Sequence, residues 1–267
     1  MARSLMVIAA TLLLGACSYF NFSSSTDETA NWSAQRLYQE AKESMNEGNY
    51  QQAIRYYERL EARFPFGRFA QQAQLEIAYA YYRDGEIASA VAACDRFIKM
   101  HPAHPNVDYA YYLKGVANFV EDQNVLTRVS DQNPAERDPR SMRESFAAFK
   151  ELVQRFPDSK YTPDAIARMN WLVNALAQHE IAVARWYVKR GAFVASANRA
   201  QYVIDNYPGT PSTEEALFIM AMSYERLGLP GLSEDAKRVL VKNFPESQIA
   251  RTGKLPTTGK WWQPWNW

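Results

Sequence analysis

The sequence of 267 residues predicts an all-α protein, built as a right-handed superhelix of about five helix pairs. From Ala34 onward the apolar residues recur at helical spacing, without an alternating run that would favour a strand. Glycine and proline interrupt this pattern at short intervals. With 47% apolar and 22% charged residues, the chain has the composition of a folded soluble domain, with no sign of disorder.

The first residues, MARSLMVIAATLLLGAC, have the pattern of a signal peptide. Their apolar run, Leu5 to Leu14, is about half the length of a membrane-spanning helix, which needs about 20 residues. The segment LGAC resembles the lipobox of bacterial lipoproteins, which implies removal of residues 1–16 and a covalent lipid on Cys17. An ordinary secretory signal with a coincidental cysteine is the alternative.

The residues after Cys17 favour a lipid-anchored protein with a spacer. Ser18, rather than an aspartate, follows the cysteine, which in this class implies sorting to the outer membrane. Residues 17–33 are rich in Ser and Thr and lack helical periodicity. We therefore expect a flexible tether between the lipid on Cys17 and the folded body.

The folded body resembles tetratricopeptide repeats. In the first repeat, Gly48 is placed to end one helix and Pro65 to end the next, with the small Ala53 where two helices approach. An aromatic residue or His followed by Pro recurs at Pro65, Pro102, Pro157, Pro208 and Pro245. The steps of 37, 55, 51 and 37 residues lie near the repeat length of about 34 or exceed it by an insertion. This predicts about five tetratricopeptide-like helix pairs.

The two longer steps define the predicted domain organisation. Repeats 1–3 occupy residues 34–163, with an inserted polar loop at 121–138. Residues 164–190 contain no Gly or Pro, which predicts a long helix of about 40 Å. With this helix, repeats 4 and 5 occupy residues 164–252. The last residues, 253–267, hold four of the chain's seven Trp and are not repeat sequence. They are expected to cap the last repeat, dock on a partner or lie at lipid headgroups.

The sequence contains no motif for catalysis or for a cofactor. It lacks a phosphate-binding glycine loop, an HExxH helix and a GxSxG turn. His101 and His104 have no acidic or thiol neighbour in sequence to complete a metal site, and Cys94 is interpreted as a small core residue. Beyond Cys17 the chain is neutral, with 29 basic and 29 acidic side chains, so no nucleic-acid partner is predicted. We expect no enzyme, no metal and no cofactor other than the lipid.

Repeat arrays usually bind partners on the face formed by the first helix of each pair. Helical spacing predicts an aromatic groove with a few cations on this face. Its expected residues are Tyr38, Lys42, Met45, Leu75, Tyr79, Tyr82, Arg83, Tyr112 and Phe119. Such a groove suits an extended peptide that carries an aromatic ring and a free carboxylate. The alternative is that these rings pack between helices.

Longer strings resemble the BamD (ComL) family of outer-membrane assembly lipoproteins over nearly the whole chain. They are FPFGRFAQQAQLEIAYAYY (64–82), HPNVDYAYYLKG (104–115), ERDP (136–139) and RGAFVASANR (190–199). The resemblance implies a non-enzymatic, lipid-anchored subunit at the periplasmic face of the outer membrane. A lipid-anchored periplasmic scaffold of envelope or division complexes is the alternative, and a cell-wall enzyme is a third class.

The same resemblance implies partners. The C-terminal repeats would bind the POTRA domains of the central β-barrel assembly subunit, alongside other lipoprotein subunits. The N-terminal repeats would receive unfolded barrel proteins, whose last strand ends in an aromatic residue. Arg199, in the RGAFVASANR segment, corresponds to an Arg that couples to the barrel subunit. Replacing Arg199 is therefore expected to weaken that binding and leave the fold intact.

Overall fold

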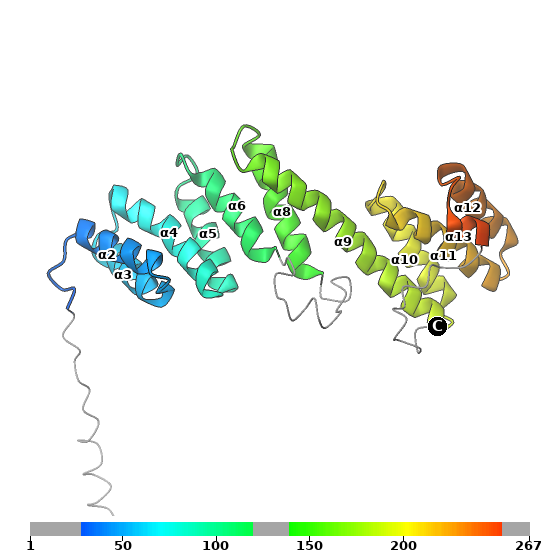
Figure 1. The fold of residues 1–267 in the computed structure, drawn as a ribbon, viewed down its shortest axis with the longest axis horizontal. Coiled ribbons are helices and arrows are strands. Elements are labelled where there is room, and N and C mark those ends of the chain that lie inside the picture. The colour runs from blue at the N-terminus through cyan, green and yellow to red at the C-terminus, as the bar shows by residue number, and fades with distance from the viewer. Residues whose placement is uncertain (1–27, 120–138, 253–267) are drawn as a thin grey trace, which may run out of the picture. The chain divides into compact units, whose positions relative to one another are not determined.

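The computed structural model describes residues 28–119 and 139–252 (Figure 1). Cys17 and the predicted signal peptide, the inserted loop at 121–138 and the Trp-rich tail lie outside these residues. The chain divides into two compact units at Ala70 and Gln71, and each unit is described by itself. The described residues contain helices, turns and loops without a strand, so the all-α prediction is confirmed.

Unit 1 holds the first helix pair, α2 (Ala34–Asn46) and α3 (Tyr50–Arg63), and the first residues of α4 (Arg68–Asp84). The turn between α2 and α3 contains Gly48, as the sequence predicts. Gly48 has φ +78°, and the N–H of Asn49 donates to the carbonyl of Ser44 at 2.8 Å. This is the left-handed cap in which glycine carries no Cβ penalty. The same geometry recurs at Gly85, Gly191 and Gly228.

The residues before α2 also pack in unit 1. Thr29 is 2% exposed. Its carbonyl and hydroxyl accept hydrogen bonds from Arg63, and its hydroxyl accepts another from Arg59 at 3.3 Å. The Trp32 ring lies 5.5 Å from that of Tyr56. Thr29 and Trp32 therefore pack against α3, so the carboxyl end of the tether predicted over 17–33 belongs to the folded part.

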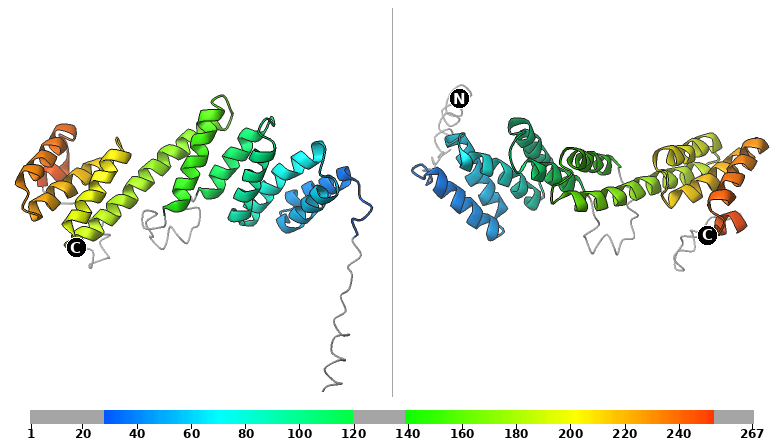
Figure 2. Two further views of the ribbon diagram at one scale, coloured as in Figure 1. Left: turned by 180° about the vertical axis from the view of Figure 1, so that it is seen from behind. Right: turned by 90° about the horizontal axis from the view of Figure 1, so that it is seen from above.

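Unit 2 continues with four more helix pairs (Figures 1 and 2). α4 and α5 (Ile87–Met100) follow each other as the second pair and share a core through Leu75 and Phe97. α6 (Val107–Asn118) packs on α8 (Arg140–Arg155). α9 (Thr162–Lys189) packs on α10 (Phe193–Asn206), and α11 (Ser212–Arg226) on α12 (Pro230–Asn243). The short α13 (Gln248–Thr252) follows α12. The second helix of every pair ends just before its predicted proline, because the residue preceding a proline disfavours helix.

A buried serine fixes the register of the third, fourth and fifth pairs. Ser196 Oγ donates to the carbonyl of Ala184 at 3.1 Å, and Ser233 Oγ to that of Ala221 at 2.9 Å. Both partners lie 12 residues earlier. Ser145 Oγ makes the same bond to Gly115 at 2.8 Å across 30 residues. The 18-residue insertion between α6 and α8 accounts for this difference, so the third pair keeps the repeat geometry of the fourth and fifth pairs.

The long helix predicted over 164–190 is α9, of 28 residues. Its amino-terminal half contributes Ala165 and Leu172 to a core shared with α5, α6 and α8. Its carboxyl-terminal half contributes Ile181 and Ala184 to a second core, with α10, α11 and α12. One helix thus connects two cores within unit 2.

Candidate functional site

A pocket of about 240 Å³ opens between α4, α6 and the loop before α9. We call it the Tyr79 pocket. Its lining residues are Gln72, Leu75, Glu76, Tyr79, Asn106, Tyr109, Lys160 and Tyr161. The volume is smaller than that of typical sites for drug-sized ligands, at about 300–1,000 Å³. The Tyr79 pocket therefore suits one side chain with its main-chain atoms.

Residues of α4 form one wall of the Tyr79 pocket. Tyr79 and Tyr82 lie with ring centroids 6.3 Å apart. Arg83 Nη1 donates to the Tyr79 hydroxyl at 2.9 Å, and its guanidinium lies 5.7 Å from the Tyr79 ring centroid. The structure thus brings three predicted groove residues together. Leu75 also lines the pocket, although it is largely buried.

The opposite wall comes from α6 and the loop before α9. The Tyr161 ring lies 5.4 Å from that of Tyr109 and stacks on Tyr112 at 4.7 Å. The Lys160 ammonium lies 5.0 Å from the Tyr161 ring centroid and supplies a positive charge. Burial raises the pKa of Tyr109 well above its usual range, so its hydroxyl stays protonated and available as a donor.

The groove residues predicted from the sequence do not include Tyr109, Lys160 and Tyr161. Lys160 and Tyr161 lie in an inter-repeat turn, where helical spacing makes no prediction. Tyr109 lies inside the quoted string HPNVDYAYYLKG, but at a position not assigned to the groove. The aromatic residue four places after Phe156-Pro157 was the available signal for Tyr161.

Tyr112 and Phe119, both predicted for the groove, instead make internal contacts. The Tyr112 hydroxyl donates to Asp164 Oδ2 at 2.8 Å, and Arg168 Nε donates to the same oxygen at 2.6 Å. Burial alone would raise the pKa of Asp164, but these two hydrogen bonds lower it below its ordinary value. Phe119 lies 5.1 Å from Trp171 and 4.7 Å from the Arg168 guanidinium. For these two residues the packing alternative fits the structure.

The remaining groove residues belong to unit 1. The Tyr38 ring lies 5.5 Å from that of Phe69 and 6.1 Å from that of Tyr57. Lys42 and Met45 lie on the same helix, α2. Because the two units are described separately, the part of the predicted groove that joins Tyr38 and Lys42 to the Tyr79 pocket stays a prediction.

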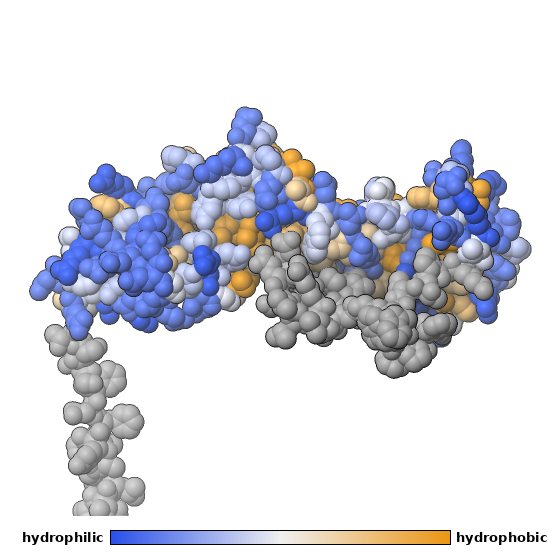
Figure 3. Space-filling model, viewed as in Figure 1, coloured by the Kyte–Doolittle hydropathy of each residue, from blue (hydrophilic) through white to orange (hydrophobic). Residues whose placement is uncertain are grey.

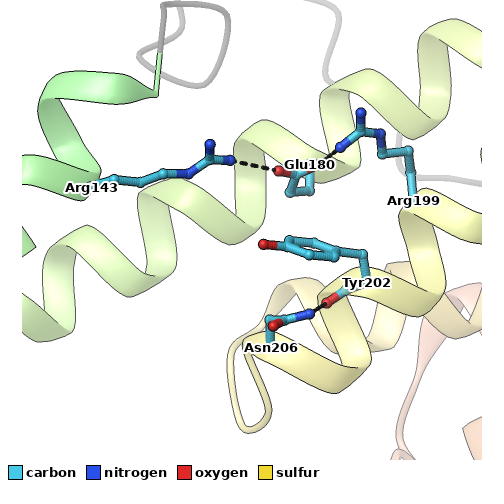
Figure 4. Close-up of polar contacts among 5 residues, drawn as sticks. All are labelled: Arg143, Glu180, Arg199, Tyr202 and Asn206. Atoms are coloured by element: carbon cyan, nitrogen blue, oxygen red, sulfur yellow. Dashed lines mark hydrogen bonds and ion pairs between the residues drawn. The ribbon is translucent and has the colours of Figure 1, made fainter.

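Arg199 takes part in a buried ion-pair cluster (Figure 4). Glu180 of α9 is 2% exposed. Its Oε2 accepts from Arg199 Nη1 of α10 at 2.9 Å, and its Oε1 accepts from Arg143 Nη2 of α8 at 3.3 Å. We call these residues the Glu180 cluster. The side chains of Arg143 and Arg199 are 52% and 45% exposed, so both guanidinium groups also reach solvent.

The expectation that Arg199 can be replaced with the fold intact stays a prediction, but the structure gives Arg199 a stabilising contact as well. Arg199 neutralises a carboxylate that the core has removed from water, and such a charge is costly without its partners. Figure 4 also shows Tyr202, whose carbonyl accepts from Asn206 within α10 at 2.9 Å. Arg199 therefore lies at a junction of three helices, exposed on one side and structural on the other.

Cys94 is buried, and burial raises the pKa of its thiol to about 12. A thiol with this pKa stays protonated at neutral pH, which fits its interpretation as a small core residue rather than a nucleophile. His101 Nε2 lies 2.6 Å from Gln74 Oε1, so this ring is paired with an amide. In residues 28–119 and 139–252, no helix has the length and apolarity needed to cross a membrane.

Comparison with known proteins identifies the family. A family model named YfiO, described as an outer membrane lipoprotein, matches residues 30–240. The outer membrane protein assembly factor BamD of Neisseria meningitidis serogroup A is 46% identical over 267 residues, which cover both chains completely. BamD of Vibrio cholerae is 35% identical over 231 residues, covering 86% of this chain and 96% of the relative. The repeats, their register and these similarities over most of the chain agree, and the chain belongs to the BamD family of outer membrane protein assembly factors.

Proposed function

We propose that this chain is a non-enzymatic subunit of the machinery that assembles β-barrel proteins in the outer membrane. A lipid on Cys17 would hold it at the periplasmic face. Membership of the assembly-factor family and a fold of stacked helix pairs support this role, because such arrays commonly work by binding other proteins. The Tyr79 pocket is the observation from which we infer a more specific role, the binding of a peptide segment.

The Tyr79 pocket is proposed to receive the terminal aromatic residue of an unfolded barrel protein. Its size suits one ring, and three tyrosines offer edges and faces for aromatic contacts. Lys160 lies where it can pair with the terminal carboxylate. Glu76, which accepts from Gln72 at 3.2 Å, places a carboxylate in the same pocket and can accept from a peptide N–H.

A fluorescent peptide that ends in Phe with a free carboxylate tests this assignment by anisotropy. We expect Lys160→Gln to weaken its binding about two- to fivefold, because exposed ion pairs contribute roughly 0.2–1 kcal/mol. Amidation of the peptide terminus should weaken binding by a similar factor, and the two changes together should cost no more than either alone.

Lys150→Gln is the matched control, since Lys150 is an exposed lysine of α8 that does not line the pocket. Equal effects of Lys150→Gln and Lys160→Gln would refute the pocket assignment. So would equal binding of the free and amidated peptides.

Arg199 is proposed to contact the POTRA region of the central barrel subunit through its exposed side. The test is co-purification of that subunit from detergent-solubilised outer membranes. We expect Arg199→Gln to lower the recovered barrel subunit several-fold, because a charge-assisted hydrogen bond to the partner is lost.

Arg143→Gln is the control for Arg199→Gln, because it removes the other partner of the same buried Glu180. Equal losses from the two variants would show that stability, rather than partner contact, explains the effect. Co-purification of wall or division proteins from the unaltered chain, without a barrel subunit, would favour an envelope scaffold instead.

A further inference from the structure

The last helix pair carries an open groove of about 550 Å³. We call it the terminal groove. Phe218, Met222, Leu240, Val241 and Ile249 supply its apolar lining, and Glu225, Arg226 and Lys237 add charges. Apolar residues are visible on the surface of these C-terminal helices in Figure 3. The groove has the volume of a site that receives large side chains.

The repeat register explains why the groove is there. Residues 37 positions earlier, in the fourth pair, are Ile181, Ala200 and Val203 in place of Phe218, Lys237 and Leu240. Those three are buried in a core with Ala216 and Ile219 of α11. In the fourth pair, α11 thus covers the surface that corresponds to the terminal groove.

After the fifth pair, the helix that would cover the groove is short. α13 begins near the register position of α11, and Ser247, its preceding residue, donates to Glu214 Oε1 at 2.5 Å. Ile249 of α13 reaches the groove. α13 ends at Thr252, and the sequence GKLP that follows is unsuited to continuing it, because Pro256 falls at the register position of Ile219.

We propose that the tail of this chain, residues 253–267, occupies the terminal groove with its Trp side chains. The tail leaves α13 three residues after Ile249, at the groove itself. Trp261 lies nine positions after Thr252, an extended reach of up to about 30 Å, which is ample for a return to α11 and α12.

The chemistry of the tail and of the groove also agrees. The tail concentrates four Trp at its end, each able to bury about 150–250 Å². The groove offers aliphatic and aromatic walls. Lys237, which pairs with Glu225 and Glu234, and Arg226, which lies 5.9 Å from the Phe193 ring centroid, add cations that can contact an indole ring. Glu225 can accept from an indole N–H.

Two valines of α12 give a matched pair for the test. Val241 lines the groove and is 57% exposed, whereas Val239 is 41% exposed and does not line it. We measure Tm for the full chain and for a chain that ends at Thr252, each with and without Val241→Glu. Truncation should lower Tm by about 4 °C or more, and Val241→Glu should lower Tm in the full chain only.

Val239→Glu should leave Tm nearly unchanged in both chains. A truncation without effect on Tm, or effects of Val241→Glu and truncation that simply add, would overturn the proposal. A photo-reactive benzophenone side chain at position 241, in the full chain, gives a second readout. It should label the 253–267 peptide within a monomer, and the same group at position 239 should not.

Labelling in a cross-linked dimer would mean that a second copy fills the groove. Labelling of another protein in membrane extracts, with none of the tail, would mean that a partner does. Either result would refute occupancy by the chain's own tail.

Discussion

Replacing both Arg143 and Arg199 with glutamine is expected to lower the free energy of unfolding by about 3 kcal/mol in urea titrations. The double change leaves the Glu180 carboxylate, which is 2% exposed, without either cation. Removing the partners of a buried charge typically costs about 3–5 kcal/mol. The lower end of that range is expected because both guanidinium groups already reach solvent.

A third change separates the charge from other effects of losing two arginines. Adding Glu180→Gln to the double variant removes the uncompensated charge and should restore most of the lost stability. If the triple variant is as unstable as the double variant, packing by the arginine side chains, rather than ion pairing, explains the loss. Each single arginine variant should lose less than half of the double effect, since one cation remains.

Gly115→Ala is expected to lower the free energy of unfolding by about 1–3 kcal/mol, the usual cost of overpacking a core. A Cβ at Gly115 would collide with the Phe149 ring, whose Cζ would lie 2.8 Å away and which is fully buried. The ring cannot move away without displacing the core between α6, α8 and α9. Urea unfolding monitored by circular dichroism measures the change.

Gly231→Ala is the control for this substitution. Gly231 lies in α12, and a Cβ there would meet no atom within 4 Å. Alanine should therefore keep or raise the stability at that position, since it favours helix over glycine. Phe149→Leu combined with Gly115→Ala should lose less stability than the sum of the single changes. Additive losses would contradict the proposed collision.

The fold could be predicted well from the sequence because each repeat marks its own boundaries. Prolines end the second helices, glycines such as Gly48 form the left-handed turns, and small residues such as Ser196 lie where helices approach. These features are local and recur, so one weak signal becomes a strong one. The long helix α9 followed from the absence of Gly and Pro between residues 164 and 190.

The candidate site could be predicted only in part. Helical spacing identifies the face of one helix but not the neighbour that covers it. Tyr79 therefore lines the pocket, with Tyr82 beside it, whereas the Tyr112 hydroxyl donates to Asp164, 52 residues later in the chain. Lys160 and Tyr161 lie in a turn without periodicity. The Glu180 cluster joins three helices, and no pattern within one helix predicts such a pairing.

The structure of α9 bears on how the described residues of unit 2 can unfold. In a simple repeat array each repeat contacts only its neighbours, so the array can melt from its ends in small steps. Here Leu172 and Ile181 lie on one uninterrupted helix but in different cores. Disordering that helix removes side chains from both cores at once. A partly unfolded state in which only one half of α9 is folded is therefore unfavourable. The two cores are coupled into one cooperative unit.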